Sequence, residues 1–284
     1  MKAFTYLTPH GSAEAVGLLR HHGPDARVIA GGQSLLLAMK DRSARPPVLI
    51  SLAGVPELSG IRTDGGELVV GATTTYAELS RANLRGWHAE IAAISGNLAD
   101  RPVRTMGTIG GALCAADPRF DMLTLVTGVG ARLEFLSSDG ARVVDPTAFL
   151  AGDGRLEPGE ILTAIRFPAV ATFDAVVFEK FRQRTFDAAL ASVLCAVRTD
   201  EEGRLTELRL TVGAATPVPM VASRARAAVL GRPGAGLDVD DVAARVVEES
   251  LGDRGDAPAV QYARELVSAL TRRALTRALT TPRS

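Results

Sequence analysis

Apolar and polar positions alternate in short runs along the first half of the chain, where strand-like and helix-like patterns are mixed. Residues 12–21 have Val16 and Leu19 on one helical face, with Ser12 as a candidate N-cap. Strands are expected at 27–30, 48–52, 67–71, 132–135 and 161–167, and further helices at 76–84 and 88–95. Because the strands are short and do not alternate regularly with helices, the pattern predicts an α+β fold.

The second half has a simpler pattern after residues 168–172. Strands are expected at 175–181, 188–199 and 205–212, and helices after Pro217, near 240–250 and at 258–279. Three strands followed by helices predict a small α+β domain. We therefore expect a first domain at 1–172, itself divided near residue 55, and a C-terminal domain at 173–284.

Composition narrows the class of protein. The chain has 284 residues, 46% of them hydrophobic and 23% charged, which is typical of a globular protein of about two domains. Lys+Arg and Asp+Glu both total 32, so there is no basic excess for a nucleic-acid partner. No apolar run approaches the roughly 18–20 residues of a membrane span, and the first residues lack the apolar core of a secretory signal.

The cysteines and histidines exclude resident metal centres. The only cysteines, Cys114 and Cys195, cannot hold a four-thiolate iron–sulfur cluster, and the four histidines lack metal-ligand spacing. Because two thiols also form no disulfide framework, a reducing compartment and a cytoplasmic location are expected. No catalytic side chain is identified, and no metal site is expected.

Two glycine pairs are the candidates for ligand binding. They lie in Ala30-Gly31-Gly32-Gln33-Ser34 and in Thr108-Ile109-Gly110-Gly111-Ala112. Glycine permits positive φ angles that direct successive amides into one concavity, which suits phosphate oxygens. Two tight turns are the plainer interpretation of either pair alone, and neither pair matches the common dinucleotide or P-loop fingerprints.

The two pairs and their surroundings together resemble the FAD-binding subunit or domain of the molybdenum hydroxylases, the group of xanthine dehydrogenase and carbon monoxide dehydrogenase. The resemblance extends over nearly the whole chain. It rests on the opening FTYLTPHGSAEAVGLL at 4–19, AGGQSLLLAMK at 30–40, GATTTYAEL at 71–79, TIGGALCAADPRFDM at 108–122, FEKFRQR at 178–184, VGAATPVPMVASRARAAVLG at 212–231 and YARELVSALTRRAL at 262–275. It implies a two-subdomain FAD-binding domain of the PCMH type, followed by the small C-terminal domain.

The resemblance also implies roles for individual residues. The FAD diphosphate would be bound by Ala30, Gly31, Gly32, Gln33, Ser34, Thr108, Ile109, Gly110, Gly111 and Ala112. Asp121 would lie near the ribityl chain or adjacent hydroxyls, with a helix N-cap as the alternative role. Lys180 would approach the pyrimidine end of the flavin, where a cation raises its potential. The alternative for Lys180 is a surface ion pair with Glu179 or another carboxylate.

Three positions depart from the pattern that the resemblance implies. Ala112 and Thr105 stand where Asn is common, and Gln33 replaces a frequent His. Losing the Asn at position 112 removes one side-chain hydrogen bond to the cofactor, about 1 kcal/mol. Cys114 lies beside this segment, and a small buried filler is favoured over a flavin contact.

The function implied by the resemblance is electron transfer. Electrons would pass from the [2Fe–2S] clusters of a small subunit, after chemistry at a molybdenum-containing large subunit, through FAD to a quinone, NAD⁺, oxygen or a carrier. Trp87 and the Pro102–Met106 segment are candidates for the docking surface, with a core role as the alternative for Trp87. Two rival functions are a stand-alone FAD oxidoreductase acting on a small molecule and a degenerate, non-catalytic scaffold subunit.

Overall fold

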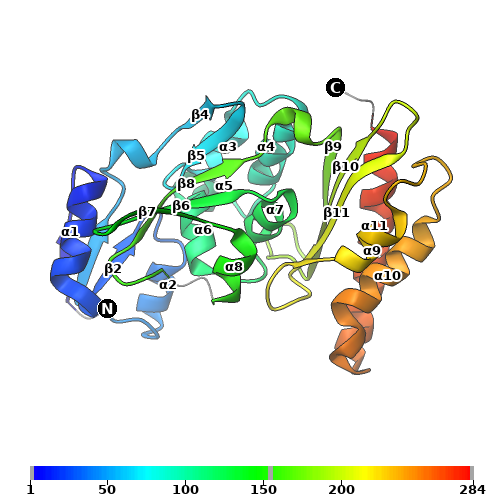
Figure 1. Cartoon of the computed structure of the whole chain (residues 1–284). Helices are drawn as coiled ribbons and strands as arrows, with labels where there is room; N and C mark the ends of the chain where they lie inside the picture. The colour runs from blue at the N-terminus through cyan, green and yellow to red at the C-terminus, as the bar shows by residue number, and fades with distance from the viewer. Residues whose placement is uncertain (1–2, 153–155, 282–284) are drawn as a thin grey trace. The chain divides into compact units, whose positions relative to one another are not determined.

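The computed structural model describes residues 3–152 and 156–281 and has the predicted α+β fold (Figure 1). The residues gather into two compact units. The first unit comprises Met1–Ala82, Asp100–Asp117 and Ala131–Phe167, and the second comprises Asn83–Ala99, Pro118–Gly130 and Pro168–Ser284. Two segments from the first half of the sequence, 83–99 and 118–130, therefore belong to the same unit as the C-terminal part.

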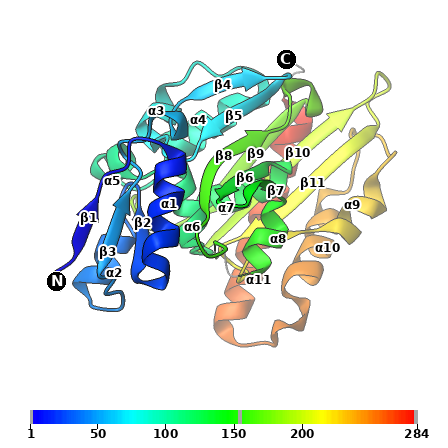
Figure 2. The ribbon, with the colours of Figure 1, turned by 60° about the vertical axis from the view of Figure 1, so that its left-hand side comes forward.

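The first unit contains a small parallel sheet near its N-terminus. Among the described residues, this sheet has three strands in the order β1 (Thr5–Leu7), β3 (Val48–Ser51) and β2 (Ala26–Ile29). Helix α1 (Ser12–His22) packs on one face of this sheet, and helix α2 (Leu35–Lys40) packs on the other (Figure 2). These opposite contacts follow from the two-residue period of a strand, since Leu49 faces α2 while its neighbour Ile50 faces α1.

The rest of the first unit is built on an antiparallel sheet. Over the described ranges its strand order is β4-β5-β8-β6-β7. The strands are β4 (Ile61–Asp64), β5 (Glu67–Gly71), β6 (Arg132–Ser137), β7 (Gly140–Val144) and β8 (Ile161–Phe167), and the helices are α3 (Tyr76–Arg81), α5 (Arg101–Met106), α6 (Ile109–Ala115) and α8 (Pro146–Ala151). Central strand β8 is apolar, with Ile161, Ile165 and Phe167 fully buried.

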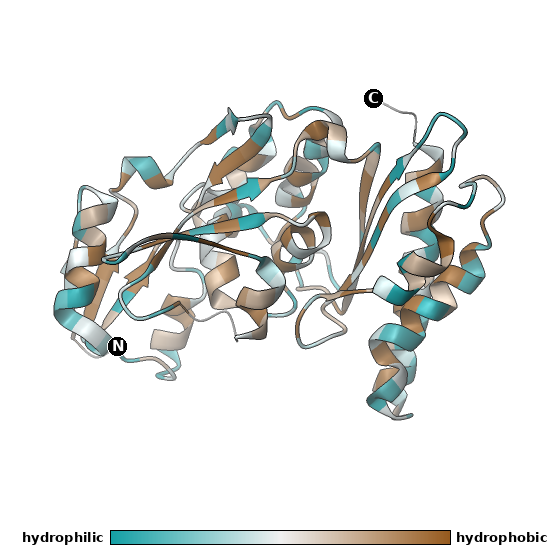
Figure 3. Cartoon of the chain, viewed as in Figure 1, coloured by the Kyte–Doolittle hydropathy of each residue, from teal (hydrophilic) through white to brown (hydrophobic). Residues whose placement is uncertain are grey.

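The second unit is an antiparallel sheet covered on both faces. Its described strands are β9 (Ala175–Phe181), β10 (Ala191–Thr199), β11 (Leu205–Gly213) and β12 (Met220–Val221), and its helices are α4 (Ala89–Gly96), α7 (Asp121–Val129), α9 (Ser223–Val229), α10 (Val239–Leu251) and α11 (Pro258–Thr280). Val193 and Cys195 of β10 face the core formed with α9, α10 and α11. Leu194 faces the opposite way, toward Gly128 of α7. Figure 3 shows the apolar residues concentrated on these strands.

The sequence pattern missed several elements and misplaced one. Strands β1, β4, β7 and β12 and helices α2, α5, α6 and α8 were not predicted, because they are short or lie in segments interpreted as loops. Helix α7 was anticipated only through the alternative role of Asp121 as an N-cap. Ser12 is the first helical residue of α1 rather than its N-cap, which is Gly11. The amide of Ser12 instead donates to Oε1 of Glu57 at 2.6 Å. Local composition alone does not reveal such a long-range partner.

Candidate functional site

The first glycine pair forms an open loop between β2 and α2. Gly32 has φ +70°, a left-handed conformation that favours glycine. The side-chain amide of Gln33 donates to the carbonyl of Gly31 at 3.2 Å, which holds the loop in place. Within the part of the chain that the structure describes, the backbone amides of residues 31–34 have no hydrogen-bond acceptor. The loop therefore presents a run of donors that remain available to a ligand.

The second glycine pair is not a loop. Thr108 is the N-cap of α6, and its Oγ1 accepts from the amide of Gly111 at 3.1 Å. The expected positive φ angles are absent at Gly110 and Gly111, which lie in the first turn of α6. This corrects the expectation that both pairs are loops of the same kind. The physical reason is the threonine cap, which starts a helix at Ile109.

The amides of the second pair already have partners. Ile109 donates to the carbonyl of Thr74 at 3.1 Å, and Gly110 donates to the carbonyl of Ala72 at 2.9 Å. Both acceptors lie in the GATTTYAEL segment, which thus supports the second pair. The sequence identified this segment only as a point of resemblance. Because these donors are used internally, the second pair offers a surface at exposed Gly111 rather than a set of unpaired amides.

The structure brings the two pairs close together. A Cβ on Gly31 would lie 1.9 Å from the carbonyl oxygen of Met106, so only glycine allows this approach. Met106 ends α5, directly before the Gly107–Thr108 step that leads into α6. A Cβ on Gly110 would lie 2.6 Å from both Cβ and O of Ala72. Gly31 and Gly110 are therefore required by packing within the first unit.

Two of the positions that depart from the pattern implied by the resemblance, Thr105 and Ala112, lie in helices α5 and α6. Ala112 is buried in α6, and its amide donates to the carbonyl of Thr108. Thr105 is exposed, and its hydroxyl donates to the carbonyl of Arg101 at 2.9 Å. Burial raises the pKa of the Cys114 thiol to about 12, with a smaller contribution from the charge of Glu160. Cys114 therefore remains a neutral thiol, as expected of a packing residue.

Asp121 and Lys180 lie in the second unit and contact each other. Asp121 is the first residue of α7, whose N-cap is Phe120, so the alternative role of Asp121 as an N-cap is wrong. Its Oδ2 accepts from Nζ of Lys180 on β9, and both side chains are buried, 3% and 10% exposed. Burial raises the pKa of the Asp121 carboxyl, while the neighbouring cations Lys180 and Arg182 oppose that rise.

The partner of Lys180 is thus Asp121 rather than Glu179. Glu179 instead binds Arg273 and Arg277 of α11, and it is itself buried. The pair is also not on the surface. The sequence alone could not identify which carboxylate pairs with Lys180, because Asp121 lies far from Lys180 along the chain.

Two further residues complete the surroundings of Lys180. Its Nζ also donates to the backbone carbonyl of Asn97, at 3.1 Å. Arg182 donates to the same carbonyl at 3.1 Å and to the side-chain Oδ1 of Asn97 at 2.9 Å. Asn97 follows α4 as its C-cap. We call these four residues, Asp121, Lys180, Asn97 and Arg182, the Asp121 cluster.

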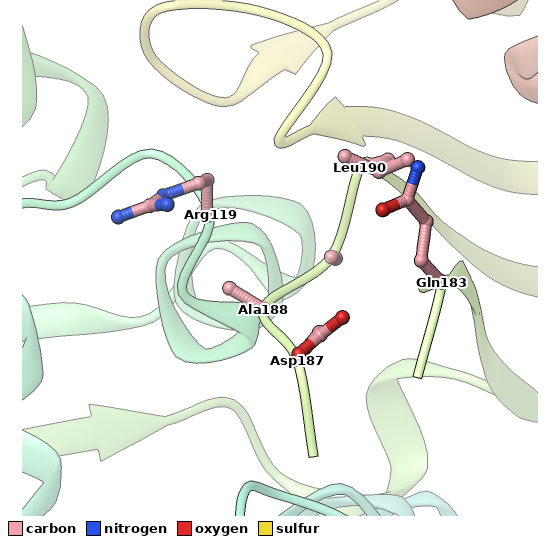
Figure 4. A pocket seen from close by; sticks show the side chains of 6 residues that line it. Arg119, Gln183, Asp187, Ala188 and Leu190 are labelled. Atoms are coloured by element: carbon pink, nitrogen blue, oxygen red, sulfur yellow. The ribbon is translucent and has the colours of Figure 1, made fainter. Parts of the chain in front are cut away.

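A shallow cavity of about 240 Å³ lies in the second unit beside the loop from β9 to β10 (Figure 4). Gln183, Asp187 and Leu190 line it from that loop, and Arg119 lines it from the segment before α7. Phe186, in the same loop, is the most exposed of the large apolar side chains in the described chain, at 64%.

The two docking candidates differ in exposure. Trp87 is buried, donates from Nε1 to the carbonyl of Ala169 at 3.1 Å and packs against Phe173, so its role is in the core. Met106, at the end of α5, is 54% exposed. In the described ranges no helix is long and apolar enough to cross a membrane. Nor do His, Cys, Asp and Glu side chains of that part of the chain gather as metal ligands.

Comparison with known proteins identifies the class. Residues 2–170 match the family described as the FAD binding domain in molybdopterin dehydrogenase, and residues 176–278 match the CO dehydrogenase flavoprotein C-terminal domain. The chain therefore belongs to the FAD-binding medium subunits of the molybdenum hydroxylase family, which are parts of FAD-containing oxidoreductases.

Particular relatives cover almost the whole chain. The carbon monoxide dehydrogenase medium chain of Afipia carboxidovorans is 34% identical over 97% of this chain and 96% of its own length. The xanthine dehydrogenase FAD-binding subunit of Escherichia coli O157:H7 is 26% identical, over 94% and 93%. A solved structure of carbon monoxide dehydrogenase from Hydrogenophaga pseudoflava has a TM-score of 0.89 and 31% identity, covering 98% of this chain and 97% of that one.

Proposed function

We propose that this chain is the electron-transfer subunit of a molybdenum hydroxylase, in which bound FAD receives electrons from a [2Fe–2S] partner and passes them to a terminal acceptor. The observation that carries the proposal is the open loop at residues 31–34, whose amides have no acceptor among the described residues. When bound, a flavin can take up electrons singly and release them as a pair. The acceptor would be a quinone, NAD⁺, oxygen or a carrier.

The residues of the first unit fit the diphosphate of FAD. Partly exposed backbone donors that lack partners are costly unless water or a ligand accepts from them, and phosphate oxygens are strong acceptors. Ala30, Gly31, Gly32, Gln33 and Ser34 would supply this contact. From the second pair, Thr108, Ile109, Gly110, Gly111 and Ala112 would supply the adjoining surface, with exposed Gly111 permitting close approach of the cofactor.

The second unit would contribute the Asp121 cluster. In this proposal Asp121 lies near the ribityl chain or adjacent hydroxyls, and Lys180 lies toward the pyrimidine end of the flavin. The buried ion pair between Asp121 and Lys180 supports this role. A buried ion pair adds little net stability, because the cost of removing both charges from water offsets their attraction, so a contact with the cofactor is a better explanation of it than stability. The division into a FAD-binding domain at 1–172, with its inner boundary near 55, and a C-terminal domain at 173–284 is part of the same proposal.

The partners follow from the chain's own chemistry. Cys114 and Cys195 are both free thiols and cannot supply an iron–sulfur cluster, so electrons come either from another polypeptide or from a directly bound substrate. Membership of the family favours the polypeptide. We propose a [2Fe–2S] small subunit and a molybdenum-cofactor large subunit as partners. Free thiols also suit a reducing compartment, and we propose the cytoplasm as the location.

The test is purification from the native host under gentle conditions, followed by sizing, an ultraviolet–visible spectrum and metal analysis. We expect a complex that contains flavin, iron and molybdenum. A chain that runs alone, loaded with flavin, and oxidises a small molecule would make the stand-alone oxidoreductase the correct function. A complex whose copy of this chain has no flavin would identify the scaffold subunit instead.

A further inference from the structure

The peptide that joins Gly31 to Gly32 in the open loop is held by a side chain rather than by the backbone. The carbonyl oxygen of Gly31 accepts from Nε2 of Gln33 at 3.2 Å. The next carbonyl, that of Gly32, accepts instead from the backbone amide of Leu36 at 3.0 Å. Of these two carbonyls, only that of Gly31 therefore depends on a side chain for its position.

The hydrogen bond from Gln33 also fixes the direction of an amide. In a planar trans peptide, the C=O of one residue and the N–H of the next point in opposite directions. The side chain of Gln33 therefore lies on one side of the Gly31–Gly32 peptide, and the amide of Gly32 points to the other side. This amide is one of the donors that have no acceptor within the described chain. Gln33 thus directs a free donor toward the open side of the loop.

The Gly31–Gly32 peptide is also the part of the loop that can rotate most easily. Its orientation depends on ψ of Gly31 and φ of Gly32, and glycine has the widest range of both angles. A rotation that exchanged the two groups would place the carbonyl oxygen of Gly31 where the amide of Gly32 now lies. A carbonyl oxygen in that place would repel a phosphate oxygen, because both atoms carry negative charge. The loop therefore needs a contact that selects one orientation of this peptide.

We infer that Gln33 is a positioning residue, whose side chain holds the Gly31–Gly32 peptide with its N–H toward the place where the diphosphate binds. The inference rests on the proposed function, in which the open loop binds the diphosphate of FAD. The side-chain amide of Gln33 is already used within the loop, so only its backbone amide remains for the cofactor. A loop held in its binding conformation before the cofactor arrives binds more tightly, because less ordering is needed on binding.

The first measurement is NMR of the full-length chain, labelled with ¹⁵N-glycine and freed of cofactor. In the wild type we expect one sharp amide signal each for Gly31 and Gly32. Gln33→Leu removes the donor, and both signals should broaden or double, because the peptide then samples two orientations. Gln33→Glu keeps the shape of the side chain but has no donor at neutral pH, so it should give the same result. Ser34→Ala, which removes a hydroxyl that does not cap α2, is the matched control and should leave both signals unchanged.

The second measurement is a fluorescence titration of the same variants with FAD. Gln33→Leu should weaken FAD binding about fivefold, which is the change expected when one hydrogen bond is lost. Gln33→Glu should weaken binding further, because its carboxylate also repels the diphosphate. The midpoint of urea unfolding of the cofactor-free chain should change little in either variant, because Gln33 is only half-buried and water can bond to the freed carbonyl of Gly31.

Three results would overturn the inference. Unchanged signals of Gly31 and Gly32 in both Gln33 variants would do so, and weaker FAD binding in that case would mean that the side chain contacts the cofactor directly. Altered signals with unchanged FAD affinity would mean that the orientation of this peptide does not matter for binding. A large fall in the stability of both variants would make the role of Gln33 purely structural. A wild-type chain that binds no FAD would contradict the proposed function itself, and the wild-type titration alone reveals that failure.

Discussion

The two glycine pairs of the first unit have nearly the same sequence pattern but differ in what their backbone amides contact. In the first pair the amides of residues 31–34 have no acceptor within the described chain. In the second pair, Ile109 and Gly110 donate to the carbonyls of Thr74 and Ala72, and Gly111 donates to the Thr108 hydroxyl. One pair is thus a set of available donors, and the other is the capped start of a helix.

The difference shows that glycine serves two purposes here. At Gly32 it permits a left-handed backbone that orients the loop. At Gly31 and Gly110 the missing Cβ allows one backbone segment to approach another, Met106 in the first case and Ala72 in the second. Only Gly111 is exposed and free of backbone contacts, so it is the glycine of the second pair where a ligand can approach.

The largest expected effect comes from the two glycines required by packing. Gly31→Ala places Cβ 1.9 Å from O of Met106, and Gly110→Ala places it 2.6 Å from Ala72. Because backbone atoms cannot move away cheaply, each variant should lower the free energy of unfolding by about 2–3 kcal/mol in urea titrations of the cofactor-free chain. Gly17→Ala is the control, because a Cβ added at this position in α1 would meet no atom within 4 Å outside the backbone of its own helix. It should raise the free energy of unfolding by about 0.5–1 kcal/mol. Wild-type stability in both packed variants would refute the account of these two glycines.

The next effect separates cofactor binding from stability. Gly111→Val adds a branched side chain at an exposed position whose nearest contact is Oγ1 of Thr108, at 2.8 Å from an added Cβ. We expect FAD occupancy to fall at least tenfold while circular dichroism stays unchanged, because the side chain blocks approach to the first turn of α6. Ala115→Val, also exposed on α6, is the matched control and should retain flavin. Full flavin content in Gly111→Val would mean that the second pair does not border the cofactor.

A smaller effect is expected from removing the side-chain hydroxyls beside the two glycine pairs, those of Thr108 and Ser34. Thr108→Ala removes a helix cap and should cost about 1 kcal/mol of stability in the cofactor-free chain. Ser34 precedes α2 without a side-chain cap, so Ser34→Ala should leave that stability unchanged. It should instead weaken FAD binding about fivefold, equivalent to about 1 kcal/mol for one hydrogen bond. Fluorescence titration with FAD and urea unfolding measure the two effects, and the reverse pattern would contradict the comparison.

The smallest effect concerns Ala112, where the family pattern has Asn. Ala112→Asn gives the second pair one side-chain donor, and we expect FAD affinity to rise by up to fivefold. Ala115→Asn, at the exposed end of the same helix, is the control and should have no effect. Unchanged or weaker FAD binding in Ala112→Asn would show that the buried position has no room to direct an amide toward the cofactor.

Much of this architecture can be read from the sequence, for reasons that the structure makes plain. The strand at 175–181 was predicted with its observed bounds, because alternating apolar residues pack on the α10–α11 side. The helical nature of 109–115 was missed although its signals were present. Thr108 is a favoured cap, and Ile109 and Leu113 have the four-residue spacing of a helix face.

The Asp121 cluster could not be predicted, because its members come from three segments that are far apart in the sequence. Asp121 begins α7, Lys180 lies on β9, Arg182 follows that strand, and Asn97 ends α4. No local pattern marks Asn97 as an acceptor for two cations. The resemblance directed attention to Asp121 and Lys180, but it did not show that they neutralise each other. Contacts of this kind appear only when the tertiary structure is known.

The central claim is that the first glycine pair donates to the cofactor while the second does not. The most direct measurement is NMR of the chain labelled with ¹⁵N-glycine, with cofactor removed and FAD then added. On adding FAD we expect large changes in the amide chemical shifts of Gly31 and Gly32 and a smaller change for exposed Gly111. The amide of Gly110 should change very little, because it is hydrogen-bonded to the carbonyl of Ala72. Large shifts at Gly110 with unmoved Gly31 and Gly32 would contradict the account.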